Sequence, residues 1–348
     1  MAKIKIKIKN LYKIFGNNPK AAMEHVRGGA SKQRLLDERG HVLGLRDINL
    51  DVPEKKIQVV MGLSGSGKST LIRHINRLIE PTEGQVVVDG EDVLAMSQDD
   101  LREFRRHKSS MVFQKFALLP HRTVAQNAAY GLTIQGIAEG EAAERAQRWI
   151  DRVGLGGFEN HFPAQLSGGM QQRVGLARAL ATDAEILLMD EAFSALDPLI
   201  RTDMQDILLD LQEELHKTIV FITHDLDEAL RIGDQIAILR DGESIQQGDP
   251  QDIILRPADD YISDFIKDIN RGRVIEVRSV MKSAARASGP KVPMDMALED
   301  ALQTLVSSSK GSGAVVDGSG KTIGKIELNS AIAAIARPDR AGVIPRYK

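Results

Sequence analysis

The sequence of 348 residues predicts an α/β fold, because three short apolar strands each run directly into residues that carry chemistry. The strand at 57–61 enters a glycine-rich loop, the strand at 186–189 ends in two adjacent carboxylates, and the strand at 219–222 ends near a histidine. Short, mainly apolar strands that alternate with helical stretches are typical of an α/β fold.

The bulk composition indicates a folded protein and excludes several classes of function. A hydrophobic content of 42% is enough for a packed core, and a net charge of −2 gives no support for a nucleic-acid partner. The absence of cysteine excludes disulfides and thiolate metal sites, and it fits a reducing, cytosolic setting. No apolar run approaches the length needed to cross a bilayer.

The expected elements follow from local patterns along the chain. Residues 3–9 alternate lysine and isoleucine, which predicts a strand with one buried face, and the repeated lysines favour the edge of a sheet. A polar insert at 17–44 is expected to hold two short helices around Gly28-Gly29. Further strands are expected at 45–52, 85–90 and 110–114, helices at 98–107 and within 124–164, and a hairpin at Asp241-Gly242.

Residues 62–70 carry the most informative local pattern of the chain, G-x-x-x-x-G-K-[ST]. Its glycines let backbone N–H groups turn inward on a polyphosphate, and the helix that follows adds the attraction of its positive end. Lys68 supplies a charge for the outer phosphates, and the Ser69 hydroxyl can ligate Mg²⁺. The residues expected to bind the nucleotide here are Gly62, Ser64, Gly65, Ser66, Gly67, Lys68, Ser69 and Thr70.

The two carboxylates after the strand at 186–189 supply the second half of a nucleotide-hydrolysing site. Asp190 is expected beside the Mg²⁺ of the nucleotide, and Glu191 lies one residue further, where it can polarise an attacking water. A buried strand that merely ends in a polar turn is the alternative, and the presence of the phosphate-binding loop argues against it.

A third pattern lies at 166–173, where Ser167 is a natural helix N-cap and Gly168 and Gly169 allow close backbone approach. The positive end of the helix that follows makes a second anion site without a lysine. This element resembles the signature motif of the ATP-binding cassette (ABC) ATPases. The other marks of that family follow in order as Gln114 in the Q-loop, 194–197 in the D-loop and His224 as the switch histidine.

The resemblance implies a fold and an assembly. The fold would be a P-loop NTPase of the ABC cassette type, with a RecA-like core, an antiparallel β subdomain and a helical subdomain that carries the signature. Two copies would face each other head to tail as a homodimer. ATP would lie between the phosphate loop of one copy and Ser167, Gly168 and Gly169 of the other.

The resemblance also implies a role for each catalytic residue. Lys68 would hold the phosphates, and Glu191 would orient or deprotonate the attacking water. His224 would contact the γ-phosphate and Glu191, and Asp197 would couple the two sites across the dimer. The Mg²⁺ shell, reached directly or through water, would be made by Ser69, Gln114 and Asp190.

An aromatic side chain near the N-terminus is expected to stack on the adenine. Phe15, just before Gly16, occupies the place usual in the family, and Tyr12 is the second choice. Simple core packing is the alternative for either ring.

Longer stretches around these motifs resemble one group within the family, the ATPase subunits of glycine betaine and proline-type importers. They include 76–82, 111–121 and 189–201, and the insert at 17–44 is similar to that group as well. The group implies ATP and Mg²⁺ as cofactors and uptake of a quaternary ammonium osmolyte such as glycine betaine, proline betaine, choline or trimethylamine N-oxide.

The implied partners are a second ATPase subunit, a transmembrane permease and a periplasmic or extracellular substrate-binding protein. The chain would then be peripheral on the cytoplasmic side of the inner membrane. A soluble regulatory or mechanochemical ATPase without a permease is the alternative, and only the importer predicts a permease that co-purifies in stoichiometric amount.

The C-terminal part is expected to form a small α+β domain that resembles a single CBS motif. Its amphipathic helix is expected at 298–305, and its two strands flank a turn at Asp317-Gly318. The pair of motifs usual in this group could form between two copies, or the segment could be a remnant. Glu327 stands where it would repel a nucleotide phosphate. The expected domains are a cassette at 1–270, the CBS-like motif at 273–336 and a tail at 337–348.

Overall fold

The computed structural model describes residues 3–114, 117–194, 196–308 and 311–336. By packing, the chain divides into two compact units, Met1–Gln247 and Gly248–Lys348. The boundary that the sequence places near residue 270, between the cassette and the C-terminal domain, stays a prediction. In terms of contacts, α11 (Pro250–Leu255) and α12 (Asp260–Phe265) belong to the second unit. Phe116 and Ala195, in two of the stretches that carry the family resemblance, lie outside the described residues.

A six-stranded sheet forms the centre of the first unit, in the order β10-β9-β3-β8-β7-β6. Five of its strands are parallel neighbours, and β10 follows β9 through the predicted turn at Asp241-Gly242. The strands are β3 (Ile57–Met61), β6 (Ser109–Val112), β7 (Ile186–Asp190), β8 (Thr218–Thr223), β9 (Gln235–Arg240) and β10 (Glu243–Gly248). Since parallel strands end at one edge, the residues that follow β3, β6, β7 and β8 are brought together there.

A second, antiparallel sheet has the order β2-β1-β4-β5. Its strands are β1 (Ile4–Phe15), β2 (Val42–Pro53), β4 (Glu83–Val88) and β5 (Glu91–Asp92). The prediction that the lysine-rich strand lies at an edge is wrong, because β1 pairs with β2 on one side and with β4 on the other. Its alternating pattern instead separates two faces: Ile6 and Ile8 are buried, while Lys9 is exposed.

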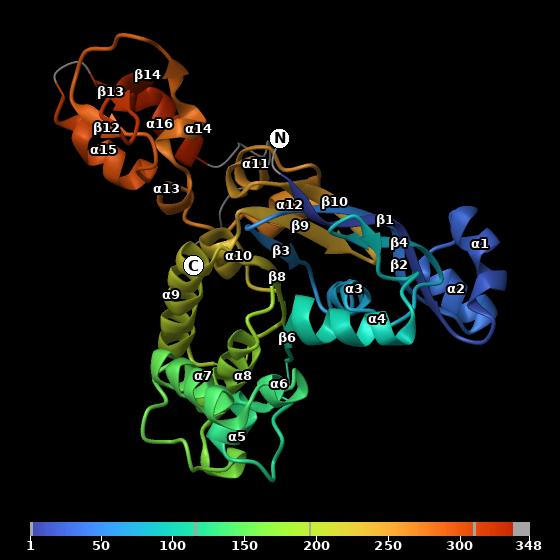
Figure 1. Ribbon diagram of the computed structural model, residues 1–348. Helices are drawn as coiled ribbons and strands as arrows, with labels where there is room; N and C mark the ends of the chain where they lie inside the picture. Colours follow the sequence, from blue (N-terminus) through green and yellow to red (C-terminus); the bar gives the residue numbers. More distant parts are fainter. Residues whose placement is uncertain (1–2, 115–116, 195, 309–310, 337–348) are drawn as a thin grey trace, which may run out of the picture. The chain divides into compact units, whose positions relative to one another are not determined.

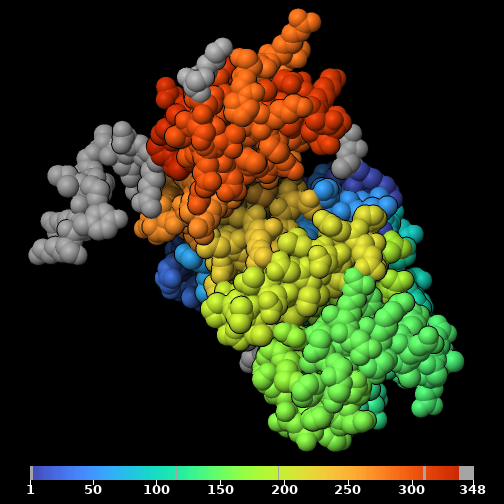
Figure 2. Space-filling model, turned by 90° about the vertical axis from the view of Figure 1, so that its left-hand side faces the viewer, coloured from blue at the N-terminus to red at the C-terminus, as the bar shows by residue number. Residues whose placement is uncertain are grey.

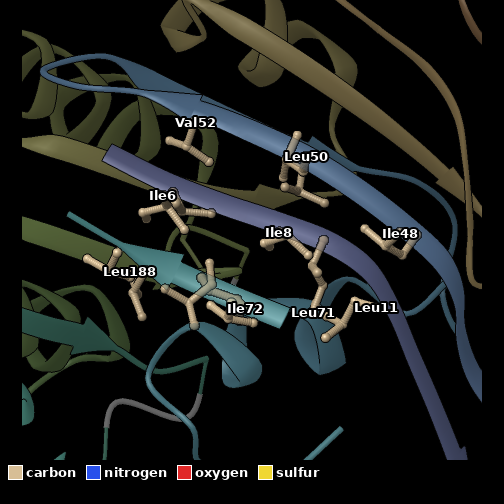
Figure 3. Packing of buried hydrophobic residues seen from close by; sticks show 14 of the residues in the cluster. Ile6, Ile8, Leu11, Ile48, Leu50, Val52, Leu71, Ile72 and Leu188 are labelled. Atoms are coloured by element: carbon tan, nitrogen blue, oxygen red, sulfur yellow. The ribbon is translucent and has the colours of Figure 1, made fainter. Parts of the chain in front are cut away.

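The buried face of the antiparallel sheet packs on the helix that begins at the phosphate loop. Figure 3 shows Ile6 and Ile8 of β1 directed toward Leu71 and Ile72 of α3 (Lys68–Ile75), within one cluster of buried side chains. Burial of each such side chain contributes about 1.5–3 kcal/mol. The helix is therefore fixed by apolar packing between the two sheets, which sets the position of the loop that precedes it.

The polar insert folds as predicted into short helices, and it has its own small core. The helices are η1 (Pro19–Ala22), α1 (Met23–Arg27) and α2 (Lys32–Arg39). Met23, Val26 and Leu35 are buried together with Ile14 of β1 and Leu43 of β2. The helix α2 begins at Ser31, whose side chain accepts a hydrogen bond from the backbone N–H of Arg34.

Helices α5 to α8 form a separate lobe of the first unit, drawn in green in Figures 1 and 2. The helices outside the insert and α3 are α4 (Gln98–Glu103), continued by the π-helix Phe104–Lys108, α5 (Val124–Ala128), α6 (Tyr130–Ile134), α7 (Glu139–Arg152), the 3₁₀ turn η3 (Pro163–Gln165), α8 (Gly168–Ala181), α9 (Pro198–Leu215) and α10 (Leu226–Ile232). Among the described residues, none of the helices has the length and apolarity that a membrane span requires.

The second unit contains a four-stranded sheet in the order β11-β14-β13-β12. Its strands are β11 (Lys282–Ser283), β12 (Lys291–Pro293), β13 (Ser312–Val316) and β14 (Thr322–Glu327), and its further helices are α13 (Arg271–Val274), α14 (Val277–Val280), α15 (Leu298–Val306) and α16 (Leu328–Ile335). The predicted helix and the two predicted strands are thus confirmed, whereas the likeness to a CBS motif stays a hypothesis. Glu327 forms an ion pair of 2.9 Å with Lys325, which compensates its charge.

His74, near the end of α3, makes the stability of the protein depend on pH. Its side chain is fully buried, and Nδ1 lies 2.7 Å from Thr70 O, so Nδ1 carries the hydrogen. Burial lowers the pKa of His74 to about 4. Below about pH 6.5, the ordinary pKa of histidine, the imidazole is protonated in the unfolded chain but stays neutral in the folded chain. The free energy of unfolding therefore decreases as the pH falls, until the pH reaches the folded pKa of His74.

The expected loss between pH 7.5 and pH 5 is about 2 kcal/mol of the free energy of unfolding. Urea unfolding at both pH values measures it, with His74→Asn as the comparison, because the asparagine amide keeps a donor near Thr70 O but does not titrate. The variant should lose less stability on acidification than the wild type. An identical pH dependence in the two proteins contradicts the assignment to His74.

Candidate functional site

The glycines of the phosphate loop are required by close backbone contacts. Gly62 has a φ of +146°, and a Cβ atom there would lie 2.1 Å from Leu239 O. Gly67 has a φ of +104°, and its Cβ would lie 2.7 Å from Gly44 O. The loop is therefore held tightly between β9 and β2, where any side chain at these two positions would collide with backbone.

The same loop offers donors that fit a phosphate. The hydroxyl of Ser66 is buried without a hydrogen-bond partner among the described residues, which is costly unless a ligand satisfies it. Ser64 and Gly65 are exposed at the tip of the loop. Thr70, further along α3, is half-buried. This combination of tight glycines, a free buried hydroxyl and an open tip matches the cradle that a polyphosphate needs.

Lys68 is the first residue of α3, and only 4% of it is exposed. Its ammonium donates to Gly62 O at 2.8 Å and to Leu63 O at 3.1 Å. It also lies 3.8 Å from Glu191 Oε1. Burial lowers the pKa of Lys68 from its ordinary value, and the negative charges of Glu191 and Asp190 oppose that shift.

Asp190 is completely buried at the end of β7 and is held from the phosphate-loop helix. Ser69 Oγ donates to Asp190 Oδ1 at 2.7 Å, and Arg73 Nη2 lies 3.1 Å from Asp190 Oδ2. A hydroxyl and a carboxylate are oxygen donors of the kind that Mg²⁺ prefers, so these residues fit the expected ion. Sequence reasoning missed Arg73, although its place four residues after Ser69 puts both on one helix face.

Glu191 is the point where the predicted catalytic residues meet. Gln114 Nε2 donates to its Oε2 at 2.7 Å, and His224 Nδ1 lies 3.9 Å from its Oε1. With Lys68 at 3.8 Å, these residues follow four different strands of the central sheet. Glu191 itself has a φ of +47°, a conformation that non-glycine residues rarely adopt and that is concentrated at functional sites.

The segment after Glu191 leads into the D-loop and α9. Ser194 Oγ donates to Glu191 O at 2.9 Å, and the exposed Asp197 caps α9 by accepting from the backbone N–H of Ile200. Arg201 donates to Leu196 O and to Asp225 Oδ2, the latter at 2.9 Å. This arginine, which sequence reasoning did not assign, ties the D-loop to the residue after His224.

Ser167 is the N-cap of α8, and Gly168 and Gly169 are its first two residues; α8 belongs to the helical lobe (Figure 1). Ser167 Oγ accepts from the backbone N–H of Met170 at 3.3 Å, as predicted for an N-cap. Ser167 and Gly168 are exposed, and a Cβ on Gly168 would meet nothing within 4 Å. Among the described residues, no hydrogen bond or ion pair joins Ser167 to the phosphate loop.

The two candidate aromatics have different surroundings. Phe15 is 39% exposed, with Lys13 Nζ 4.9 Å from its ring centroid. Its ring lies against Gly44, where a Cβ would come within 2.8 Å of it. Tyr12 is only partly buried, but it packs against the small core of the insert. Phe15 is therefore the more exposed of the two rings, and it lies against β2, the strand whose Gly44 also contacts Gly67.

Comparisons with known proteins decide which family carries this arrangement. The family model described as "ABC transporter" matches residues 45–194. The glycine betaine transport ATP-binding protein OpuAA of Bacillus subtilis is 52% identical over 296 residues, which cover 84% of this chain and 71% of that protein. The chain belongs to the ABC transporter family. As a member of it, the protein is an ATPase subunit, and the predicted family is confirmed.

Two further relatives extend over almost the whole chain. The glycine betaine/proline betaine transport system ATP-binding protein ProV of Salmonella typhimurium is 48% identical over 334 residues, covering 96% of this chain and 83% of that protein. The trimethylamine N-oxide transport system ATP-binding protein TmoW of Pelagibacter ubique is 44% identical over 332 residues, covering 95% and 97%.

A solved structure with the same fold supports the cassette architecture. It is the dimeric ATP-binding cassette MJ0796 in a post-hydrolysis state, bound to ADP and Pi. The match has a TM-score of 0.61 and 34% identity, and it covers 70% of this chain and 98% of the other. The predicted ABC cassette fold, with its core, antiparallel sheet and helical lobe, is thus confirmed.

Proposed function

We propose that this ATPase is the energy-coupling subunit of an importer for quaternary ammonium osmolytes or related methylated amines. The observation that carries the ATPase part is the convergence of Lys68, Gln114 and His224 on the carboxylate of Glu191. The transport part rests on relatives whose names specify glycine betaine, proline betaine and trimethylamine N-oxide. These likenesses do not favour a soluble regulatory ATPase.

The proposed chemistry assigns one task to each group. Lys68, Ser66 and the loop amides hold the phosphates of ATP, and Glu191 accepts a proton from the attacking water. Gln114 and His224 orient the carboxylate of Glu191 and keep it directed at that water. Ser69 and Asp190, together with Gln114, would hold Mg²⁺ directly or through water, and the bound ion would supply charge neutralisation for the phosphate oxygens. The hydrogen bond from the Ser69 hydroxyl to Asp190 places the two oxygen donors together, which supports their assignment to one Mg²⁺ site.

The site is proposed to be completed by a second copy of the chain. Ser167, Gly168 and Gly169 present an exposed helix start that no residue of their own phosphate loop contacts through a described hydrogen bond. Such an N-terminus attracts a phosphate. Asp197, exposed at the start of α9, is proposed to lie in the same dimer interface and to couple the two sites. The dimeric state of the related cassette supports this assembly.

The remaining partners follow from the importer assignment. They are a transmembrane permease, which would place the subunit peripherally on the cytoplasmic face of the inner membrane, and a periplasmic or extracellular substrate-binding protein. The transported compound binds to those chains, so the class of methylated amine is proposed from the relatives alone.

Reconstituted uptake tests the function. The chain is co-expressed with its permease, purified in mild detergent and inserted in vesicles with ATP on the cytoplasmic face. We expect stoichiometric permease and ATP-dependent uptake of labelled glycine betaine or trimethylamine N-oxide. The variant Ser167→Arg should bind ATP like the wild type but should reduce uptake at least about 100-fold, because the bulky cation obstructs the composite site. A chain that purifies without the permease and hydrolyses ATP at its full rate would contradict the proposal that it belongs to an importer.

A further inference from the structure

A cavity of about 510 Å³ is lined by the insert, by β2 and by residues 240–245 at the turn between β9 and β10. The insert contributes Lys32 and Leu36, and β2 contributes Val42 and Arg46. Val42 is the direct partner of Phe15 in the antiparallel ladder, so the two side chains share one face of the sheet. The cavity therefore begins beside the ring proposed to stack on adenine.

One residue of the cavity lining, Lys32, contacts the phosphate loop. The ammonium of Lys32 donates to Gly65 O at 2.9 Å, a carbonyl at the exposed tip of that loop. This contact crosses from the insert to the nucleotide motif, two segments that are 33 residues apart in sequence. One side chain of the insert thus already touches the motif that holds the phosphates.

The charge of Lys32 has no counter-ion within the described part of the chain. Its described contact is the neutral carbonyl of Gly65, and no ion pair of Lys32 occurs among the described residues. The neighbouring cation Arg46 is different, because its Nη1 lies 2.8 Å from Glu243 Oε1. The carboxylates of Asp241 and Glu243 line the same cavity, but neither forms a described ion pair with Lys32. A half-buried ammonium at the rim of an anion site that is not already paired with a carboxylate is suited to an incoming phosphate.

The position of Lys32 in its helix argues in the same direction. It is the first residue of α2, and the first turn of that helix holds no acidic residue. A cation at a helix N-terminus is disfavoured by the helix dipole, so this choice brings no local stability. A residue that is unfavourable for the local helix is expected where its side chain has a role in a functional site.

We propose that Lys32 is a nucleotide-binding residue that pairs with a phosphate of bound ATP or ADP, and that α2 forms one wall of the nucleotide site. The inference rests on the proposed function, because it uses the same phosphate loop. On binding, the ammonium exchanges its carbonyl partner at Gly65 for a phosphate oxygen. The insert is then part of the nucleotide site, in addition to packing against the antiparallel sheet.

Calorimetric titration of the full-length chain with ADP tests the proposal, and adenosine, measured by competition, serves as the uncharged probe. Lys32→Ala should weaken ADP binding about five- to tenfold and change adenosine binding less than about twofold. Lys32→Arg should retain ADP binding within about twofold. The control Arg34→Ala lies on the same helix, where Arg34 pairs with Glu38 at 2.8 Å, and it should bind ADP like the wild type.

Two outcomes overturn the inference. Wild-type affinity for ADP in Lys32→Ala removes the proposed contact, and an equal loss for ADP and adenosine shows that Lys32 only shapes the loop. Lys68→Ala, titrated in parallel, separates this failure from that of the proposed function. If Lys68→Ala also binds ADP with wild-type affinity, the phosphate site itself is wrongly assigned. If Lys68→Ala binds ADP weakly while Lys32→Ala binds it normally, only the proposed role of Lys32 is wrong.

Discussion

Replacing Glu191 by glutamine is expected to leave ATP binding intact and to lower the rate of hydrolysis about 10²- to 10⁴-fold. The amide of Glu191→Gln preserves the size of the side chain, and the Gln114 amide can still donate to its oxygen. It cannot accept the proton of an attacking water, however. Steady-state phosphate release, measured beside nucleotide affinity, separates the two effects, because only the rate should fall.

The matched control for this variant is Glu213→Gln, which makes the same chemical change at an exposed position of α9. It should hydrolyse ATP at the wild-type rate. Ordinary turnover in Glu191→Gln would remove the proposed role of Glu191, whatever its position in the structure.

Replacing Lys68 by alanine is expected to weaken ATP binding about 10- to 100-fold and to abolish measurable hydrolysis. The ammonium is almost fully buried, and it donates to two carbonyls of the loop itself. Its loss therefore removes a positive charge that binds the phosphates and two hydrogen bonds that hold the loop in its conformation. Equilibrium binding of ATP and the hydrolysis rate at saturating nucleotide measure the two losses.

Lys68→Arg should fail as well, because the bulkier, planar guanidinium does not fit the space between Gly62 O and Leu63 O. Lys9→Ala, at an exposed position of β1, should behave like the wild type. Wild-type affinity in Lys68→Ala would show that the nucleotide binds elsewhere.

The parts of the fold and site that could be predicted from the sequence are those with a local signal. The glycine loop carries its own conformational requirement, and the apolar strands before it and before Asp190 are continuous in sequence. Parallel strands that end at one edge then bring Gln114, Glu191 and His224 together without further information. The hairpin at Asp241-Gly242 was equally local, because both residues take positive φ.

The parts that could not be predicted depend on partners far away in sequence. The lysine-rich β1 looked like an edge strand, but it pairs with β4, more than 70 residues later, and no local pattern indicates that pairing. Arg73 and Arg201 were given no role in the site from the sequence. Their carboxylate partners, Asp190 and Asp225, are brought to them only by the packed fold. Lys32 was missed for the same reason.

The domain boundary shows a different limit. The motifs of the cassette all lie before the boundary that the sequence places near residue 270, whereas the packing divides the chain after Gln247. A helix can follow the last motif in sequence and still make most of its contacts with the next compact unit. The boundary between the cassette and the C-terminal domain therefore stays a prediction.

The most direct test of the whole account is the mass of Glu191→Gln in solution, measured by light scattering after gel filtration with and without Mg²⁺-ATP. The account predicts a single subunit without nucleotide and a nucleotide-locked pair at saturating Mg²⁺-ATP, which the additional change Ser167→Arg returns to single subunits. A Glu191→Gln protein that stays monomeric at saturating Mg²⁺-ATP, with its permease present as well, would contradict the shared nucleotide site.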